Sequence, residues 1–365
     1  MQPVGEHERY RVLDVLRGLA LFGVLLVNLL GAFRISLFEQ IVGARVESGW
    51  VNPLIEQATA VLVEFKAFAI FSFLFGVGAA IQSERAATRG MAVRPFLARR
   101  FAILFAFGLA HIVFIWNGDI LALYGICGLL LVPLIKARTW LLGAIGVGLI
   151  VIPYVAPLPI PWPSMEAMRA QAADATRVYA QGGVGEIFLF RCREAWGFMM
   201  PLWLGSLPRT AGLMALGVAA WRAGILRGPE RHRTFLLCVL VAGIGIGLTL
   251  KSSEPLAAGY VAAILLWLKP ARVAGLAALG QCLAALGQMA LTNYLMQSVV
   301  LSFVFYGFGL GLFGKLDSVQ GLGIVIVLYG AQVAFSLYWL KRFRFGPCEW
   351  LWRSLTYGQW QANSR

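Results

Sequence analysis

LDVLRGLALFGVLLVNLLGAF, residues 13–33, is an apolar run that carries a charged pair, Asp14 and Arg17, in its first turns. The run is long enough to cross a bilayer, since a membrane-spanning helix needs roughly 20 apolar residues. An ionisable side chain at membrane depth is costly, so it usually pairs, faces a cavity or serves a site. Asp14 and Arg17 lie three residues apart on one helix face and can form an ion pair. The pair therefore predicts either a structural clamp or part of a functional site.

The rest of the composition extends this prediction to the whole chain. Of the 365 residues, 59% are hydrophobic and 13% are charged, whereas a soluble domain carries about 25% charged residues. We expect an all-α, polytopic integral membrane helix bundle. The net charge of +14 is attributed to cytoplasmic Arg and Lys beside anionic lipid headgroups, which favours the lipid bilayer as partner and argues against nucleic acid. The five cysteines are scattered and contain no C-x-x-C, so neither a disulfide framework nor a metal site is indicated.

The apolar runs predict about ten transmembrane helices. They start near Leu13, Ala58, Leu97, Ile120, Trp140, Thr210, Thr234, Pro255, Leu283 and Val319. Basic loops usually stay in the cytoplasm, and this places both termini there. An eleventh run, 186–204, is interrupted by Arg191, Arg193 and Glu194, and we expect it to be re-entrant or interfacial.

One domain is predicted from these runs. Residues 1–345 form the transmembrane bundle, with an external loop at 156–185. Residues 346–365 form an interfacial C-terminal helix and tail, because Pro347 suits a first helical turn and the tryptophans suit the headgroup zone. The sequence makes no prediction of oligomeric state.

Ionisable groups inside the spans are the candidate catalytic residues. His111 lies on the third span, and the predicted topology puts Glu64, Asp119 and Asn28 at a similar depth. An imidazole beside a carboxylate makes an oriented general base. The alternative is a polar network that holds the helices together. Asn293 and Gln297 are four residues apart on a later span, where they either line a polar path or join helices.

Five ordered segments resemble the YeiB-like family of bacterial membrane proteins over nearly the whole chain. They are LDVLRGLALFGVLLVN (13–28), FSFLFGVG (71–78), HIVFIWNGDILALYGI (111–126), LGQMALTNYLMQS (286–298) and RFRFGPCEWLWRSLTYG (342–358). This resemblance implies a multi-pass protein of the bacterial inner (cytoplasmic) membrane.

The chain is also similar, more distantly, to transmembrane acyltransferases such as heparan-α-glucosaminide N-acetyltransferase and the bacterial O-antigen acyltransferases. The shared element is D-x-x-R-G, here Asp14, Arg17 and Gly18. In the O-antigen branch, ten residues separate the Arg from a functional His. The glucosaminide branch has an Asn at that position and a catalytic His shortly afterwards. Here Asn28 occupies that position, and no His follows it before His111. Either His111 has taken over that role, or the chain does not acylate by that chemistry.

The resemblance implies transfer of an acyl (acetyl) group from cytoplasmic acyl-CoA to an extracytoplasmic hydroxyl or amine of a glycan or small molecule. His111 would act as base or nucleophile, oriented by Glu64 or Asp119. Asn28 and Asn293 are candidates for binding the acceptor, and either could donate to the oxyanion that forms during transfer. We expect acyl-CoA as a co-substrate and no tightly bound cofactor. Its binding is assigned to the charged residues Asp14, Arg17, Arg85, Arg94, Arg99 and Arg100.

Two other functions are compatible with the same residues. A transporter or permease for a small polar or anionic solute would use Gln297 and the interrupted segment with Arg191, Arg193 and Glu194, because broken membrane segments often form transport sites. A non-catalytic scaffold for envelope assembly is a further alternative.

Overall fold

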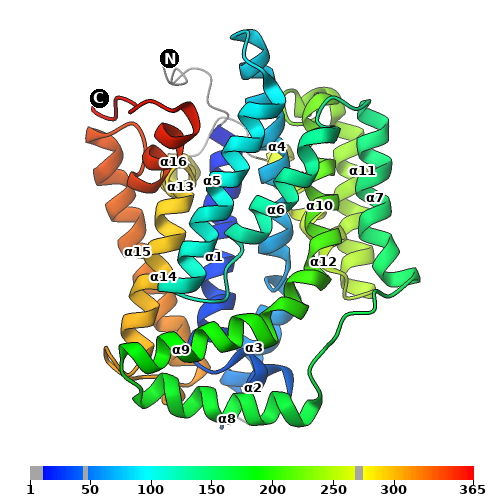
Figure 1. Cartoon of the computed structure of the whole chain (residues 1–365). Helices are drawn as coiled ribbons and strands as arrows, with labels where there is room; N and C mark the ends of the chain where they lie inside the picture. The colour runs from blue at the N-terminus through cyan, green and yellow to red at the C-terminus, as the bar shows by residue number, and fades with distance from the viewer. Residues whose placement is uncertain (1–10, 44–47, 268–273) are drawn as a thin grey trace.

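The computed structural model describes residues 11–43, 48–267 and 274–365, and every regular element in these ranges is a helix. The expected all-α membrane bundle is thereby confirmed (Figure 1). The helices are α1 (Arg11–Asn28), η2 (Leu29–Phe33), α2 (Leu37–Ile41), α3 (Val51–Leu62), α4 (Lys66–Thr88), α5 (Val93–Phe114), α6 (Leu121–Leu131), η3 (Val132–Leu134), α7 (Thr139–Val155), α8 (Met165–Gln181), α9 (Val184–Glu194), η4 (Ala195–Met199), α10 (Met200–Arg222), η5 (Pro229–His232), α11 (Arg233–Thr249), α12 (Ser253–Trp267), α13 (Ala274–Gln288), α14 (Ala290–Phe305), α15 (Ser318–Arg342) and α16 (Pro347–Tyr357).

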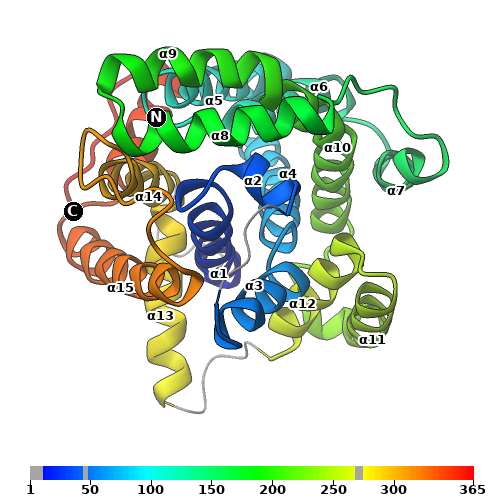
Figure 2. The ribbon, with the colours of Figure 1, turned by 90° about the horizontal axis from the view of Figure 1, so that it is seen from below.

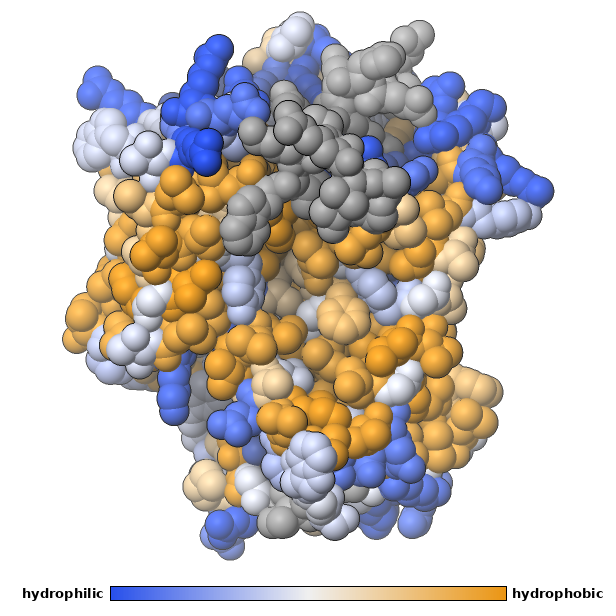
Figure 3. All heavy atoms as spheres, turned by 180° about the vertical axis from the view of Figure 1, so that it is seen from behind, coloured by the Kyte–Doolittle hydropathy of each residue, from blue (hydrophilic) through white to orange (hydrophobic). Residues whose placement is uncertain are grey.

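The long helices have the length and composition of membrane spans. In the described residues, five helical stretches are long and apolar enough to cross a bilayer: Arg11–Phe33, Val51–Thr88, Val93–Phe114, Pro229–Thr249 and Ser318–Arg342. Four shorter helices are also apolar. Figure 3 shows apolar side chains gathered around the middle of one face, with hydrophilic side chains at both ends. This distribution matches a bilayer core between two aqueous surfaces.

Two of the predicted spans are broken within their length. The run near Ala58 forms α3 and α4, separated at residues 63–65, where Phe65 has a φ of 60°. The run near Leu283 forms α13 and α14, separated at Met289. Irregular backbone at membrane depth is tolerated where it is buried in protein or lines a cavity. The break at Met289 lies beside a cavity that its neighbours Gln288 and Ala290 help to line.

Helices α8 and α9 lie side by side across one end of the bundle (Figure 2). The chain then continues through the π-helical turn η4 into α10, which runs back through the bundle (Figure 1). The interrupted segment 186–204 therefore turns at the end of the bundle. The opposite end carries the start of α1 and the C-terminal helix α16 (Figure 1).

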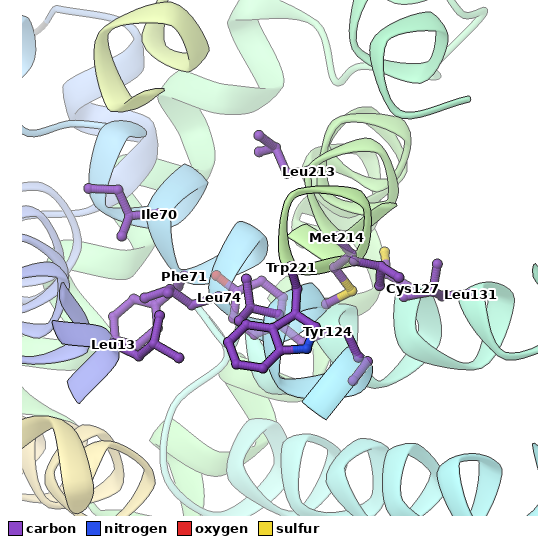
Figure 4. Close-up of a cluster of buried hydrophobic side chains, with 14 of the residues drawn as sticks. Leu13, Ile70, Phe71, Leu74, Tyr124, Cys127, Leu131, Leu213, Met214 and Trp221 are labelled. Atoms are coloured by element: carbon purple, nitrogen blue, oxygen red, sulfur yellow. The ribbon is translucent and has the colours of Figure 1, made fainter. Parts of the chain in front are cut away.

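The core is built from close helix crossings. Leu13, Phe71, Tyr124 and Met214 belong to its largest hydrophobic cluster, to which α1, α4, α6 and α10 contribute (Figure 4). At the α1–α13 crossing, a Cβ added at Gly287 would lie 1.8 Å from the backbone oxygen of Asp14, and one at Gly18 would lie 2.2 Å from that of Leu283. Only glycine permits this approach, so Gly18 of the D-x-x-R-G element has a packing role.

Candidate functional site

His111 and Asp119 form a buried pair near one end of α5. Nδ1 of His111 lies 2.8 Å from Oδ2 of Asp119, and both side chains are 0% exposed. The other carboxylate oxygen of Asp119 accepts the backbone N–H of Ala122, at 2.6 Å, which fixes it against the first turn of α6. Nε2 of His111 has no hydrogen-bond partner among the described residues. The arrangement is that of an oriented imidazole whose second nitrogen is available for proton transfer.

Aromatic rings surround this pair. The ring of Tyr294, on α14, lies 5.3 Å from the His111 ring, and that of Trp116 lies 6.4 Å from it. The hydroxyl of Tyr294 accepts the backbone N–H of Ile120 at 3.4 Å, directly beside Asp119. These contacts exclude water from the pair, which strengthens electrostatic interactions there.

The main cavity reaches from a basic mouth to the neighbours of this pair. It has about 1430 Å³ of space free of protein atoms, part of it open to solvent. Its apolar walls come from α1, α4, α5 and α6. Four arginines line it, Arg17, Arg85, Arg100 and Arg353, and at its other extreme lie Ile120, Tyr124 and Tyr294. Along α5, the rise from Arg100 to His111 is roughly 16 Å at 1.5 Å per residue.

The cavity contains some of the predicted cofactor-binding residues and not others. Asp14 and Arg17 form the expected ion pair, 2.7 Å apart, and both line the cavity. Arg85 and Arg100 line it too. Arg94 is exposed and donates to the backbone oxygen of Pro133. The exposed Arg99 lies against Gly358, outside the set of lining residues.

Helix α16 contributes cavity residues that the sequence analysis missed. Arg353, Trp352 and Glu349 all line the cavity, whereas the sequence pattern predicts only an interfacial anchor. The guanidinium carbon of Arg100 lies 3.7 Å from the centroid of the Trp352 ring. The indole N–H of Trp352 donates to the backbone oxygen of Arg100. Gln82 is a further missed residue: it is buried, and its Oε1 has no partner in the described part of the chain.

Glu349 joins α16 to the start of α14. Its carboxylate accepts the backbone N–H groups of Leu291 and Thr292, at 2.6 and 3.1 Å, and the hydroxyl of Thr292 at 2.6 Å. A carboxylate at a helix N-terminus satisfies donors that the helix itself leaves open. Burial nevertheless raises the pKa of Glu349 above its ordinary value.

Replacing Glu349 with alanine is expected to lower the free energy of unfolding by about 1–3 kcal/mol, because the first N–H groups of α14 lose their acceptor. Thermal unfolding of the purified protein in detergent measures this change. Glu230→Ala, in an exposed turn, is the control and should leave the unfolding temperature unchanged. Equal unfolding temperatures for the two variants would contradict this role of Glu349.

Arg191 and Glu194 lie at the other end of the bundle, on the far side of the pair. Arg191 donates to the backbone oxygen of Ile115. Glu194 accepts Asn117 at 2.6 Å and Tyr179 at 2.5 Å through one oxygen, and it accepts Gln171 at 3.1 Å through the other. Burial and the nearby Glu194 raise the pKa of Tyr179, which keeps its hydroxyl protonated as a donor. Arg193, in contrast, is exposed.

The remaining predicted residues lie away from His111 or hold helices together. Glu64 lies at the α3–α4 break and lines a second cavity with Arg34, Glu39 and Glu56, so the carboxylate that contacts His111 is that of Asp119. Asn28, half-buried, ends α1.

Asn293 and Gln297 join α14 to α15. Asn293 donates to Ser336 at 2.9 Å, and Gln297 donates to Gln332 at 2.9 Å. Both pairs are buried, as expected of polar groups that link membrane helices. Within the described ranges, no three His, Cys, Asp or Glu side chains lie together where they could hold a metal ion.

Comparison with known proteins finds bacterial proteins of related sequence. A family model described as "Protein of unknown function (DUF418)" matches residues 249–359, a stretch that includes Tyr294, Glu349 and Arg353. The chain is 35% identical to "Uncharacterized protein YxaH" of Bacillus subtilis (strain 168), over 99% of this chain and 97% of that protein. It is 29% identical to "Uncharacterized protein YeiB" of Escherichia coli (strain K12), over 96% of each. The chain therefore belongs to the YeiB-like family.

Proposed function

We propose that the protein is a membrane acyltransferase that takes an acyl group from acyl-CoA at the arginine-rich end of the bundle. The observation that carries this proposal is the cavity, which joins Arg17, Arg85 and Arg100 to Tyr294, a direct neighbour of His111. Guanidinium groups form strong charge-assisted hydrogen bonds with phosphate, so the mouth suits the phosphates of CoA. The apolar wall between the arginines and Tyr294 suits the arm of CoA that carries the thioester.

In the proposed reaction, Nε2 of His111 takes a proton from the acceptor hydroxyl or amine as that atom attacks the thioester carbonyl. The carbon–sulfur bond then breaks, and the proton passes from the imidazolium to the departing CoA thiolate. Asp119 orients the ring and stabilises the imidazolium. A route in which His111 itself takes the acyl group first uses the same atoms.

Tyr294 is the best-placed donor to the oxygen that becomes negative during the attack. Its hydroxyl accepts the N–H of Ile120 and keeps its own proton to donate. It also lines the cavity, whereas the amide of Asn293, the sequence-based candidate, is engaged with Ser336. A donor aimed at a developing oxyanion is worth a large part of a typical rate enhancement.

The basic mouth corresponds to the predicted cytoplasmic side. Both relatives described above are bacterial proteins. We therefore propose that the protein lies in the cytoplasmic (inner) membrane of a bacterium. The acceptor, a glycan or a small molecule with a hydroxyl or amine, would then come from the outer side.

A transporter for a small polar or anionic solute is the second candidate, and one observation favours it. The break between α13 and α14 lies on the cavity, where Gln288, Ala290 and Leu291 contribute to the lining. Discontinuous helices of this kind form the substrate sites of many transporters.

Acetyl-CoA and CoA are expected to raise the unfolding temperature of the purified protein in a saturable way. A ligand at 100 times its Kd stabilises the folded state by about 2.7 kcal/mol. Arg85→Gln removes one cavity arginine and should weaken this stabilisation. Arg94→Gln and Arg99→Gln are matched controls, since these exposed arginines lie outside the cavity.

A folded protein that gains no stability from any acyl-CoA would contradict the acyltransferase proposal. Solute uptake into liposomes without CoA, insensitive to Arg85→Gln, would support the transporter instead. If Arg85→Gln and the two control variants lost the same amount of CoA-dependent stabilisation, the binding would reflect general charge attraction rather than a defined site.

A further inference from the structure

At the end of the bundle opposite the arginines, the hairpin of α8 and α9 lies over α5 and the link that follows it. Viewed along the bundle, the two helices lie across this end (Figure 2). The hairpin contacts α5, α2 and the residues between α5 and α6. The His111–Asp119 pair beside the hairpin is 0% exposed, and the arginines of the main cavity lie towards the other end.

A small set of polar contacts holds the hairpin in this position. Glu194 is the centre of the set: Tyr179 ties α8 to it, and Asn117 ties it to the link that carries Asp119. Arg191 adds a contact to the backbone oxygen of Ile115, which also accepts the hydroxyl of Ser302 on α14. Hydrogen bonds to a charged group are stronger than those between neutral groups, so the loss of a few of them is enough to release such a contact.

The hairpin is joined to the bundle at both ends by segments that are not regular α-helix. On one side, residues 156–164 connect α7 to α8 without regular structure and include Pro157, Pro159 and Pro161. On the other, the π-helical turn η4 follows Glu194 immediately. Single π-helical turns within α-helices are often found at functional sites.

Polar atoms without partners are gathered under the hairpin. Among the described residues these include Nε2 of His111, the hydroxyl of Tyr306 and Nε of Arg191. The ring of Tyr306 stacks on Tyr179 of α8, with the centroids 4.6 Å apart. Buried polar groups normally have partners, and several exceptions in one place call for an explanation. A ligand that enters when the hairpin lifts would supply those partners.

We infer that α8 and α9 form a hinged lid, latched by Glu194, which opens to admit a polar ligand to His111 from the end opposite the arginines. The lid does not depend on acyl transfer, because a transported solute would need the same opening. With the cavity open at the arginine end, the structure is the state in which this lid is closed.

Chemical labelling of a buried thiol tests the lid directly. The reporter is Ser302→Cys, which lies at the carbonyl that Arg191 contacts and is 5% exposed as serine. It is placed in a protein whose five cysteines are replaced by alanine: Cys127, Cys192, Cys238, Cys282 and Cys348. Adding Glu194→Gln, which keeps the side-chain volume but removes the charge, is expected to speed reaction with a water-soluble maleimide about tenfold or more.

Matched variants separate lid opening from general loosening. Arg177→Ala removes exposed ion pairs to Asp174 and Glu186 on the same hairpin and should leave the labelling rate unchanged. A second reporter, Ser336→Cys on α15, is fully buried away from the hairpin and should stay protected in Glu194→Gln. An unchanged rate at Ser302→Cys, or an equal rise at both reporters, would overturn the lid.

Hydrogen–deuterium exchange gives a second measurement that needs no reporter cysteine. In Glu194→Gln, amides of residues 165–194 should exchange faster, while those of α15 keep the wild-type rate. Unchanged exchange at 165–194 in a folded variant would likewise overturn the proposal. Neither measurement involves CoA, so failure of the lid and failure of the acyltransferase proposal are distinguishable.

Discussion

His111→Gln is expected to lower the rate of acyl transfer about 10²–10⁴-fold, the usual contribution of a positioned general base. Glutamine can hydrogen-bond but cannot accept the proton of an attacking hydroxyl or amine. The cavity mouth lies roughly 16 Å away along α5, so stabilisation by CoA should be retained. The measurement is release of CoA from acetyl-CoA in the presence of candidate acceptors, with CoA-dependent unfolding temperature as the second readout.

Two further variants sharpen this prediction. Asp119→Asn keeps a polar partner for Nδ1 but removes the charge that stabilises the imidazolium, so it should also slow transfer while CoA still binds. His232→Gln, in the turn before α11, is the control and should keep the wild-type rate. A wild-type rate of acyl transfer in His111→Gln would show that His111 takes no part in the reaction.

Gly287→Ala is expected to destabilise the protein by at least about 1–3 kcal/mol, the usual cost of forcing extra volume into a packed core. The new Cβ would lie 1.8 Å from the backbone oxygen of Asp14, so α1 and α13 would have to separate. The lost contacts lie beside Arg17 and Gln288, both on the cavity. Thermal unfolding in detergent and the yield of folded protein both report the change.

Gly280→Ala is the matched control, since it lies on the same helix and its Cβ would meet nothing within 4 Å. Alanine has a higher helix propensity than glycine by about 1 kcal/mol, so this variant should be neutral or slightly more stable. Similar unfolding temperatures for the two variants would show that the α1–α13 crossing tolerates a methyl group.

The sequence was sufficient to predict the membrane bundle and the Asp14–Arg17 ion pair. The length of a hydrophobic run is enough to identify a membrane span. Two residues spaced i, i+3 lie on the same face of a helix, so they can form a pair. Depth in the membrane also follows from topology, and it brought His111, Asp119 and Glu64 to a similar level. Which carboxylate meets the imidazole depends on the helices that pack side by side. Glu64 lies instead at the α3–α4 break, in the second cavity.

Helix α16 shows why part of the site escaped prediction. An amphipathic helix rich in tryptophan has the same pattern whether its rings face lipid headgroups or pack on protein. Trp352 packs against Arg100, and Glu349 meets the start of α14. Those partners are about 250 and 60 residues away in the sequence, at distances over which no local periodicity carries information.

The α1–α13 crossing also bears on how the D-x-x-R-G signature should be used to annotate genomes. A side chain at its glycine, Gly18, would collide with the backbone oxygen of Leu283. The backbone oxygen of its aspartate, Asp14, lies directly against Gly287. Geometry of this kind would be kept even in a protein that had lost its chemistry, because the helices would still have to cross. A search with the signature alone therefore detects a shared architecture. Evidence for a shared reaction has to come from residues that packing leaves unconstrained, such as the free nitrogen of His111.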